Sequence, residues 1–526
     1  MAVHDGLIVA LGSDEKILTR FKNPKVHLID LHGAFVMAGL NDAHVHFGEA
    51  GRRKLQVDLT GSASLADMQQ RVKLAAQSSA PGSWLQGGGW DHTLWAAKLT
   101  PTRADLDSVT GGHPAIFTRI DGHIAIANSA ALAAAGIDRN TPDPQGSKID
   151  HDAQGELTGI LREDPAMELV WKRIPAPTEK LRRHGLELAI ADAVLHGLTS
   201  VQDNSDWEDF LVFEQLEREG KLSLRVSEWL PFNAPLDQLQ KMRASHPAGD
   251  RMLHTGMLKG FMDGSLGSRT AAMKQPFSDD PENSGIPRYD AAKLNAMTVE
   301  RAAAGFQIGF HAIGDRAASM ALDAFAEAEK TSPISSTSGL ERGIGTGDTH
   351  LSNRLRIEHA QVVDPADIAR FKGLGVIASM QPNHLLTDMN WAEQRLGPER
   401  AKYSYAWKAF LDAGVPLAFG TDYPVEPVTP YRGIYSAVTR RNEAGTQTYP
   451  GDPLLIGQAL YAYTQGSAYA EFAESWKGKL APGYVADFVV LDRDLTKISP
   501  AEILKTRVLR TVVDGKTAYL VDEKAR

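Results

Sequence analysis

The sequence contains no cysteine, and this absence removes several kinds of chemistry at once. Disulfide bonds, thiolate metal sites and a cysteine nucleophile are all excluded. Long apolar runs are also missing, since no stretch of about 18 consecutive apolar residues occurs. The first residues, MAVHDGLIVALGSDEK, lack the basic start and unbroken apolar centre of a secretory signal. Because the chain has no cysteine, any tight metal site in it must use histidine, carboxylate or modified lysine side chains.

The chain also lacks an excess of basic residues. Its formal net charge is −9 and its pI about 6.0, with acidic and basic residues scattered along the sequence. This balance predicts neither a nucleic-acid partner nor an anionic membrane surface. We expect a cytoplasmic protein, and a periplasmic location stays open if a leader has been removed. With 526 residues, 43% of them hydrophobic, the chain is long enough to bury a large core.

Short apolar runs alternate with alanine-rich segments of helical period through the middle of the chain. Helices are predicted at 179–196, 290–304 and 316–330. Eight apolar runs fit the strands of such an alternation: FVMAGLNDAHVH, TSVQD, LSLRVSEWL, LKGFMDG, FQIGFHAIGD, RIEHAQ, VIASMQP and PLAFGTD. The pattern predicts an α/β protein built on a (β/α)8 TIM barrel over residues 37–475.

Three regions depart from this alternation. Residues from about 60 to 165 are too many for a normal connection and contain the strand-like AIFTRIDGHIAIAN and the helical NSAALAAAG, which indicates an inserted lid or cap. Both ends, 1–36 and 476–526, show short β-rich runs between Gly and Asp turns, which predicts one small β-sandwich domain formed by both termini. The polar stretch at 331–350 is typical of a surface loop.

The segment NDAHVHF places His44 and His46 two residues apart on a predicted strand. A two-residue period points both imidazoles to the same side, and Asp42 shares that side. At the carboxyl end of a barrel strand, this pair can supply two nitrogens to one metal ion, with Asp42 orienting an imidazole. Two ordinary strand-end histidines are the alternative.

Later strands also end in residues that can bind metal. Lys259 lies in LKGFMDG, His311 in GFHAIGD, His359 in RIEHA and Asp422 in FGTD. Charged groups at strand ends inside a barrel must be paired or coordinated, because burying them alone is costly. The repetition of such residues at strand ends favours a metal centre over a purely structural explanation.

These residues, together with several longer motifs, resemble the amidohydrolase superfamily, whose members are metal-dependent hydrolases on a distorted (β/α)8 barrel. The terminal GKLAPGYVADFVVLDRD is similar to the small sheet domain of that superfamily. The likeness is more specific to the amidohydrolase-3 branch, which includes the YtcJ-like proteins. It rests on GGGWD at 87–91, RIDGHIAIANSAAL at 119–132, DGSLGSRTA at 263–271, HAIGDRA at 311–317, RIEHAQ at 356–361, SMQPNH at 379–384 and GTDYPVEP at 420–427.

The resemblance implies a binuclear centre, most simply with Zn²⁺. His44 and His46 would bind the more buried ion and His311 and His359 the more exposed one. Asp422 would ligate the first ion and contact the water between the two. Lys259 would bridge both ions as a carboxylated lysine, whose negative charge suits two cations where an ammonium would repel them. An unmodified Lys259 that binds a substrate anion is the alternative, and Glu163 in GILRE is the rival bridging carboxylate.

Such a centre lowers the pKa of bound water towards about 7 and makes hydroxide available at neutral pH. Asp422 would take the proton of the attacking water and deliver it to the leaving nitrogen. His123 is the candidate donor to the oxyanion, and packing within its loop is the other interpretation. Weaker candidates for binding substrate are Trp90, Asp91, Asp121, Arg269 and Gln381.

The predicted function is metal-dependent hydrolysis of a carbon–nitrogen bond other than a peptide bond, in an N-acyl or N-formyl amide. Deamination is an alternative, although Ala312, Ile313, Gly314 and Asp315 follow His311 where deaminases of this fold commonly carry a glutamate. Another hydrolysis or an isomerisation at the same centre stays open, as does a non-catalytic scaffold. The expected partner is a small-molecule substrate, and a homodimer stays open.

Overall fold

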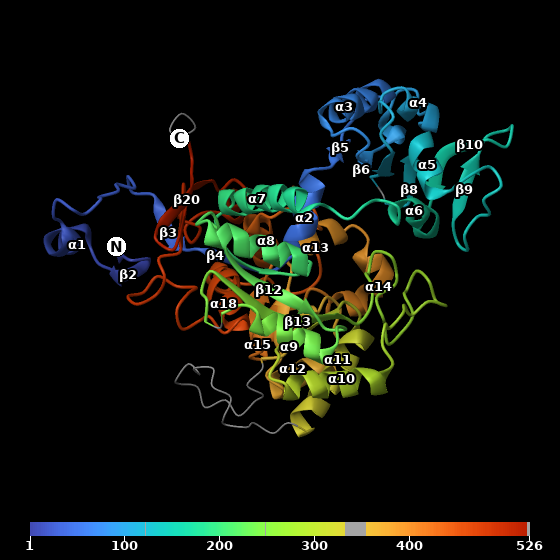
Figure 1. Ribbon diagram of the computed structural model, residues 1–526. Helices are drawn as coiled ribbons and strands as arrows, with labels where there is room; N and C mark the ends of the chain where they lie inside the picture. The colour runs from blue at the N-terminus through green and yellow to red at the C-terminus, as the bar shows by residue number, and fades with distance from the viewer. Residues whose placement is uncertain (121, 248, 332–353, 523–526) are drawn as a thin grey trace. The chain divides into compact units, whose positions relative to one another are not determined.

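The computed structural model describes all residues except 121, 248, 332–353 and 523–526. Its contacts divide the chain into two compact units (Figure 1). The larger unit contains residues 1–50 and 186–526, and the smaller contains residues 51–185. Most of the loop predicted at 331–350 lies outside the described residues.

A sheet of eight parallel strands forms the centre of the larger unit, in the order β17-β16-β15-β14-β13-β12-β11-β4. A parallel bridge between Val45 and Tyr423 brings the end of the first strand beside the chain that follows the last, so the sheet nearly closes on itself. The predicted (β/α)8 barrel is therefore confirmed. The strands are β4 (Leu40–Val45), β11 (Leu198–Asp203), β12 (Arg225–Pro231), β13 (Leu253–Phe261), β14 (Ile308–Ala312), β15 (Arg356–His359), β16 (Ile377–Met380) and β17 (Leu417–Phe419).

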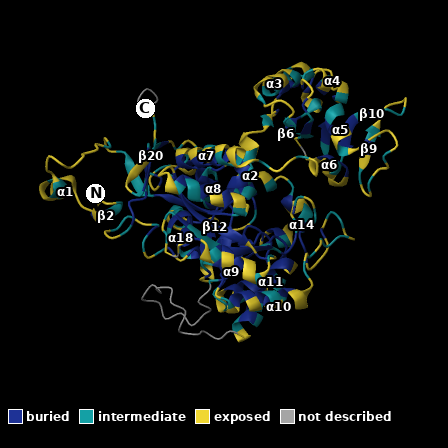
Figure 2. Ribbon diagram, in the orientation of Figure 1, coloured by how far each residue is buried: buried dark blue, intermediate teal, exposed yellow. Residues whose placement is uncertain are grey.

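The barrel strands are buried on both faces (Figure 2). Every residue of β4, β11, β15, β16 and β17 is buried. A strand in a parallel barrel packs against helices outside and side chains inside, so its sequence is largely apolar without alternating. The charged residues that these strands do contain must therefore find partners within the barrel.

Helices follow the barrel strands along the chain. Three of them match the predicted helices to within one residue at each end: α7 (Glu179–Leu195), α10 (Ala291–Ala303) and α11 (Asp315–Thr331). Phe325 of α11 stacks on Phe310 of β14 with ring centroids 5.3 Å apart, which fixes this helix on its strand. The remaining helices of this unit are α1 (Asp14–Phe21), α2 (Phe47–Lys54, which continues into the smaller unit), α8 (Trp207–Arg218), α9 (Leu236–Ala244), α12 (Pro365–Gly373), α13 (Asn383–Asp388), α14 (Ala392–Ala401), α15 (Trp407–Asp412), α16 (Pro430–Thr439), α17 (Ile456–Tyr461), α18 (Ser467–Ala470) and α19 (Pro500–Ile503).

Both chain ends contribute to one antiparallel sheet, in the order β20-β19-β18-β3. Strand β3 (Phe35–Ala38) pairs with β18 (Phe488–Leu491), which is followed by β19 (Val508–Val513) and β20 (Lys516–Leu520). A separate two-stranded sheet joins β1 (Ala2–His4) and β2 (Leu7–Ala10). Arg225 at the start of β12 donates to both carboxylate oxygens of Asp487 at 2.6 and 3.0 Å, so an ion pair ties the barrel to this terminal region.

The smaller unit has its own mixed sheet, in the order β5-β6-β7-β8-β10-β9. Strands β7 and β8 and helix α5 fall on the strand-like and helical segments predicted there. Its elements are β5 (Val57–Asp58), β6 (Leu85–Trp90), β7 (Ala115–Arg119), β8 (Ile124–Ala127), β9 (Lys148–His151), β10 (Leu157–Arg162), α3 (Leu65–Ser78), α4 (Arg103–Asp107), α5 (Ser129–Ala135) and α6 (Asp164–Trp171).

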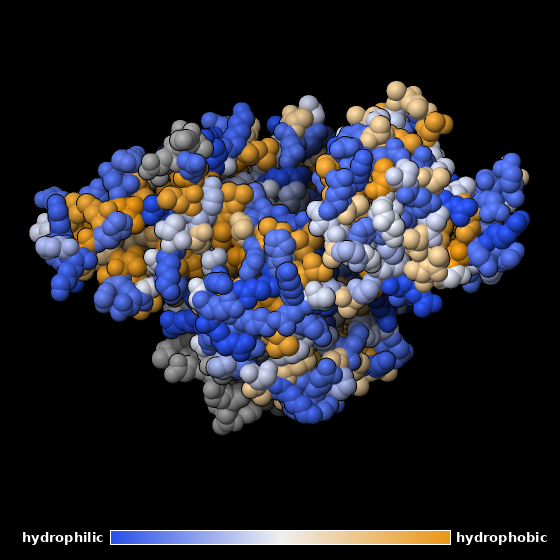
Figure 3. Space-filling model, turned by 45° about the horizontal axis from the view of Figure 1, so that its top comes forward, coloured by the Kyte–Doolittle hydropathy of each residue, from blue (hydrophilic) through white to orange (hydrophobic). Residues whose placement is uncertain are grey.

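The surface carries both hydrophilic and hydrophobic residues. Hydrophilic side chains cover most of the face in Figure 3, with smaller hydrophobic patches among them. Among the helices of the described residues, none has the length and apolar character needed to cross a membrane.

Candidate metal centre

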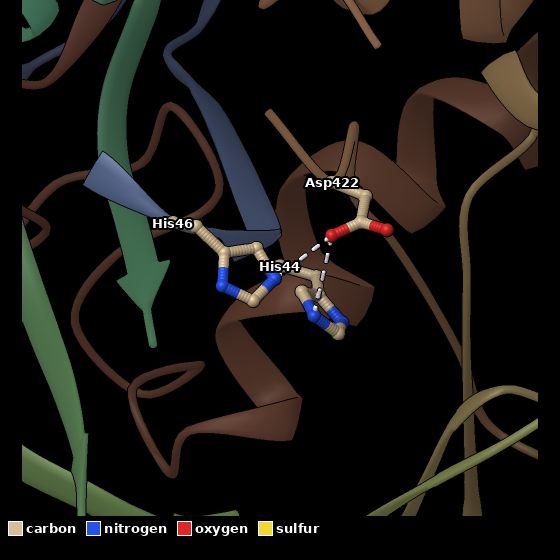
Figure 4. A group of neighbouring side chains, drawn as sticks. All are labelled: His44, His46 and Asp422. Carbon is tan, nitrogen blue, oxygen red and sulfur yellow. Dashed lines mark ion pairs between the residues drawn. The ribbon is translucent and has the colours of Figure 1, made fainter. Parts of the chain in front are cut away.

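His44, His46 and Asp422 come together at the carboxyl ends of the first and last barrel strands (Figure 4). The Oδ1 atom of Asp422 lies 3.0 Å from His46 Nε2 and 3.6 Å from His44 Nε2. Both imidazoles therefore turn to one side of β4, as their spacing predicts. Two imidazole nitrogens and a carboxylate oxygen at this separation are suitable ligands for one divalent ion.

Hydrogen bonds to the Nδ1 atoms of His44 and His46 orient the two imidazoles. His44 Nδ1 lies 2.8 Å from Glu358 Oε2, and both side chains are fully buried. His46 Nδ1 lies 3.2 Å from the carbonyl oxygen of Asn204. In each case Nδ1–H donates to the outer acceptor and Nε2 keeps its lone pair. In His44 this nitrogen lies 3.0 Å from Lys259 Nζ and 3.6 Å from Asp422 Oδ1. This is the arrangement that fixes the tautomer of a metal-binding histidine.

His311 and His359 lie next to this group, on β14 and β15. Their ring centroids are 4.5 Å apart, and that of His359 is 4.9 Å from that of His44. His311 Nε2 lies 2.9 Å from the carbonyl oxygen of Gly264, so its Nδ1 is left as the possible ligand. His359 Nδ1 is buried and has no hydrogen-bond partner among the described residues. A buried imidazole nitrogen without a partner is what a metal ligand requires before the ion is bound.

Positive φ angles occur at two of these positions. His359 has φ 71° and Asp422 has φ 60°. Such conformations are strained for residues other than glycine and concentrate at functional sites. At His359 the turn of the backbone breaks the strand alternation, so that Glu358 and His359 both approach His44 although they are consecutive.

His384, which the sequence analysis did not single out, completes a second group of possible ligands with His359 and Asp422. Its Nε2 lies 3.1 Å from Asp422 Oδ2, on the other carboxylate oxygen from His46. His384 belongs to α13, in the SMQPNH motif after β16, where no strand or spacing pattern marks it as a ligand. Glu358 was missed because strand alternation predicts that it points away from its neighbour His359.

Lys259 reaches the same group from β13 and is buried, with 3% of its surface exposed. Its Nζ lies 3.0 Å from His44 Nε2 and 5.1 Å from the ring centroids of both Trp229 and Phe261. Burial lowers the pKa of the Lys259 ammonium to about 8. A neutral amine is therefore accessible near neutral pH.

Asp42 does not orient an imidazole, although its place on the strand suggested that role. It accepts hydrogen bonds from the backbone instead. Its Oδ1 accepts from the backbone N–H groups of His44 and Thr421 at 3.1 and 2.9 Å, and its Oδ2 accepts from the Thr421 hydroxyl at 2.6 Å. Asp42 thus joins β4 to the turn that carries Asp422, and Glu358 provides the acceptor for the imidazole.

Burial strongly affects the protonation of the side chains in the candidate metal centre. It lowers the pKa of His44 and His359 well below the usual value and that of His311 to about 4, so these imidazoles are neutral and able to bind metal. Burial also opposes the charge of Asp422, but the surrounding imidazoles outweigh it and hold the pKa of that carboxyl well below its usual range. At neutral pH, His44, His311 and His359 therefore present neutral nitrogens and Asp422 an ionised carboxylate. His384 differs, because burial opposes its charge but the hydrogen bond to Asp422 outweighs that effect and raises the pKa of its imidazole to about 9.

Among the weaker candidates for substrate binding, Gln381 lies beside His44 in the candidate metal centre, whereas Arg269 forms an ion pair elsewhere. Gln381 is buried, and its Nε2 is 3.4 Å from His44 Nδ1. Together with His359 and His384 it lines a small cavity. Arg269 donates to both carboxylate oxygens of Asp279 at 3.2 and 2.8 Å, which accounts for its charge without a substrate.

The other candidates belong to the smaller unit. Trp90 is fully buried and its indole N–H donates to the Phe117 carbonyl at 2.9 Å, as expected of a core residue. Asp91 accepts from Arg119 at 3.0 Å. His123 Nδ1 lies 2.9 Å from Glu163 Oε2. The roles given to these residues stay predictions, and Asp121 lies outside the described residues.

A model of the amidohydrolase family, in its amidohydrolase-3 branch, matches residues 27–519. This chain belongs to that family. The match confirms the prediction that this chain is an amidohydrolase enzyme. It also confirms the amidohydrolase-3 branch that the sequence motifs indicated. The match includes all the barrel strands and therefore every residue of the candidate metal centre.

This amidohydrolase is similar over nearly its whole length to proteins of other organisms. It is 34% identical to the protein of Bacillus subtilis named as the amidohydrolase YtcJ, with 98% of this chain and 95% of the relative covered. It is 26% identical to the N-substituted formamide deformylase of Arthrobacter pascens, with 98% and 94% covered. Among solved structures, a metal-dependent hydrolase of Pyrococcus furiosus described as uncharacterized matches with a TM-score of 0.76 and 32% identity, covering 94% of this chain and 95% of that one.

Replacing Glu358 by Gln is expected to lower the affinity of this amidohydrolase for a divalent metal ion such as zinc by roughly 10- to 100-fold. The glutamine keeps the shape but loses the charge that holds His44 Nδ1–H, so the imidazole is less basic and less well oriented. Competition with a zinc chelator measures the change. Glu15→Gln, an exposed position in α1, is the matched control. Equal affinities in the two variants would contradict the orienting role.

Proposed function

We propose that this chain is a metal-dependent hydrolase of carbon–nitrogen bonds outside peptides, with N-formyl or N-acyl amines as its substrates. The observation that carries the proposal is the position of the Asp422 carboxylate. One of its oxygens faces His46 and the other faces His384. The deformylase of Arthrobacter pascens, named for N-substituted formamides, supports the choice of an amide substrate.

The ligands are suited to divalent ions, and to zinc in particular, because they combine neutral imidazoles with a carboxylate. His44, His46 and Asp422 would hold one ion and His311 and His359 a second, with His384 near enough to contribute. The buried His359 Nδ1, which has no partner among the described residues, fits this assignment. When bound, such ions polarise a carbonyl group and lower the pKa of water towards about 7.

Lys259 would bridge the two ions after carboxylation. The neutral amine attacks carbon dioxide, a nitrogen–carbon bond forms and one proton is released, which gives a carbamate with two oxygens and a negative charge. The lowered pKa of Lys259 supports this step because it makes the neutral amine accessible. The carbamate would also replace a cation 3.0 Å from a metal-binding nitrogen by an anion.

Asp422 would move the protons of the reaction. Its ionised carboxylate takes a proton from the attacking water and then gives it to the departing nitrogen, so one group serves as base and then as acid. His384 lies 3.1 Å from the second carboxylate oxygen and would hold it in place during both transfers. The leaving amine needs this proton because an amide anion is too basic to depart.

A panel of N-formyl and N-acyl amines tests the proposal, with release of the free amine as the readout and zinc added to the enzyme. We expect turnover of at least one such amide by the parent chain and by His27→Ala, a control at an exposed histidine, and none by His44→Ala. Equal activity of His44→Ala and the parent would contradict the site. Release of ammonia from aminated rings, with no amide turned over, would point to deamination instead.

A further inference from the structure

A second group of possible metal ligands lies in the larger unit, away from the residues discussed above. It consists of Glu217 on α8 and of His246 and Asp250 on the turn between α9 and β13. One ligand atom from each of these three residues lies within 4.8 Å of the other two. Glu214, one turn earlier on α8, contacts the same histidine. We refer to these four residues as the α8 cluster.

His246 is the central residue of the α8 cluster and is 8% exposed. Its Nδ1 lies 2.9 Å from Glu214 Oε1, so the Nδ1–H group donates to that carboxylate. Its Nε2 is buried, has no hydrogen-bond partner among the described residues, and faces Asp250 Oδ2 at 3.5 Å. With the proton on Nδ1, the lone pair of Nε2 points at the carboxyl groups of Glu217 and Asp250. This repeats the carboxylate–histidine arrangement that orients imidazoles towards metal ions.

The carboxyl groups of Glu217 and Asp250 converge on this nitrogen. Asp250 Oδ1 is already engaged by the backbone N–H groups of Met252 and Leu253 at 2.7 and 3.3 Å, so Oδ2 is the oxygen that faces inward. Two carboxyl groups brought together repel each other when both are ionised, and a cation between them removes that cost.

We propose that Glu217, His246 and Asp250 bind a divalent transition-metal ion such as zinc, with Glu214 holding the imidazole. One imidazole nitrogen with carboxylate oxygens suits zinc or manganese, whereas calcium prefers six to eight oxygen ligands. Waters would complete the coordination, since the two carboxylate side chains are partly exposed.

The position of the α8 cluster predicts a structural role for this ion. Helix α8 ends before β12, and the turn with His246 and Asp250 leads into β13, so the cluster lies at the amino ends of these strands. The catalytic groups of such barrels gather at the opposite, carboxyl end. The ion would link α8 to the turn before β13, the strand that carries Lys259, and would stabilise the fold without taking part in hydrolysis.

The zinc content of the purified protein tests the proposal directly. The chain is freed of metal, loaded with zinc, passed through a desalting column and analysed for zinc per chain. We expect Glu217→Gln to hold one ion fewer than the parent, while Glu208→Gln, an exposed position on the same helix, holds the same number as the parent. In a His44→Ala background, which impairs the candidate metal centre, Glu217→Gln is again expected to remove one ion, so failure of the proposed function does not affect this result.

Thermal unfolding provides a second readout. Zinc is expected to raise the Tm of the His44→Ala chain by roughly 2 °C or more, and this rise should disappear when Glu217→Gln is added. Circular dichroism without zinc checks that each variant is folded, and Asp250→Asn replaces Glu217→Gln if it is not. Equal zinc contents and equal zinc-dependent Tm shifts in the parent and the α8 variants would overturn the proposal.

Discussion

Replacing Asp422 by Asn is expected to lower kcat by about 10³-fold or more on the best amide substrate, with a much smaller change in KM. Asparagine has the same shape and can still accept hydrogen bonds through one oxygen. It cannot take a proton from water or return one to the leaving nitrogen. It also removes the negative charge that lies between His46 and His384.

The measurement is steady-state kinetics on zinc-loaded protein, with zinc content determined on the same samples. Asp237→Asn, an exposed position on α9, is the matched control and should behave as the parent. If Asp422→Asn keeps its zinc and its kcat stays within tenfold of the parent, Asp422 does not transfer the proton. A loss of zinc together with activity would show that its main contribution is as a ligand.

Replacing Lys259 by Arg is expected to abolish binding of at least one ion and to lower activity by at least about 10²-fold. A guanidinium stays protonated and cannot add carbon dioxide, so it would place a fixed positive charge beside His44 Nε2. An unmodified lysine that binds a substrate anion predicts the opposite result, since arginine binds carboxylate and phosphate groups well and would keep much of the activity.

Bicarbonate distinguishes the two roles of Lys259 in the unaltered protein. Metal-free protein reloaded with zinc in buffer depleted of carbon dioxide should regain activity slowly, and added bicarbonate should accelerate the recovery. With ¹³C-labelled bicarbonate, a carbamate carbon signal should appear in the parent and be absent from Lys259→Arg. Recovery that is independent of bicarbonate, with no carbamate signal, would show that Lys259 acts as a free amine.

The main parts of the fold follow from local patterns. Apolar runs that end in polar residues, separated by helices such as α7, α10 and α11, specify a parallel barrel because each strand needs a helix to cover it and to return the chain. The histidines at strand ends follow from the same pattern, since the carboxyl ends of all eight strands meet at one end of the barrel.

The partners behind those histidines could not be predicted in the same way. Glu358 and the consecutive His359 both approach His44, because a positive φ at His359 breaks the alternation of β15, and no local signal predicts that angle. His384 belongs to α13, which follows β16, and reaches Asp422 only through the folding of that connection. The α8 cluster likewise joins a helix to a turn that are separate in the sequence.

The sequence by itself therefore determined the family and the barrel, and it predicted the kind of ligand that the centre offers, because these depend on periodicity and on motifs of neighbouring residues. The tertiary structure decided which acceptors bind the imidazoles of the centre, that Glu358 rather than Asp42 orients His44, and that His384 joins Asp422. Those features depend on contacts between residues far apart in the chain, and only the folded barrel brings such residues together.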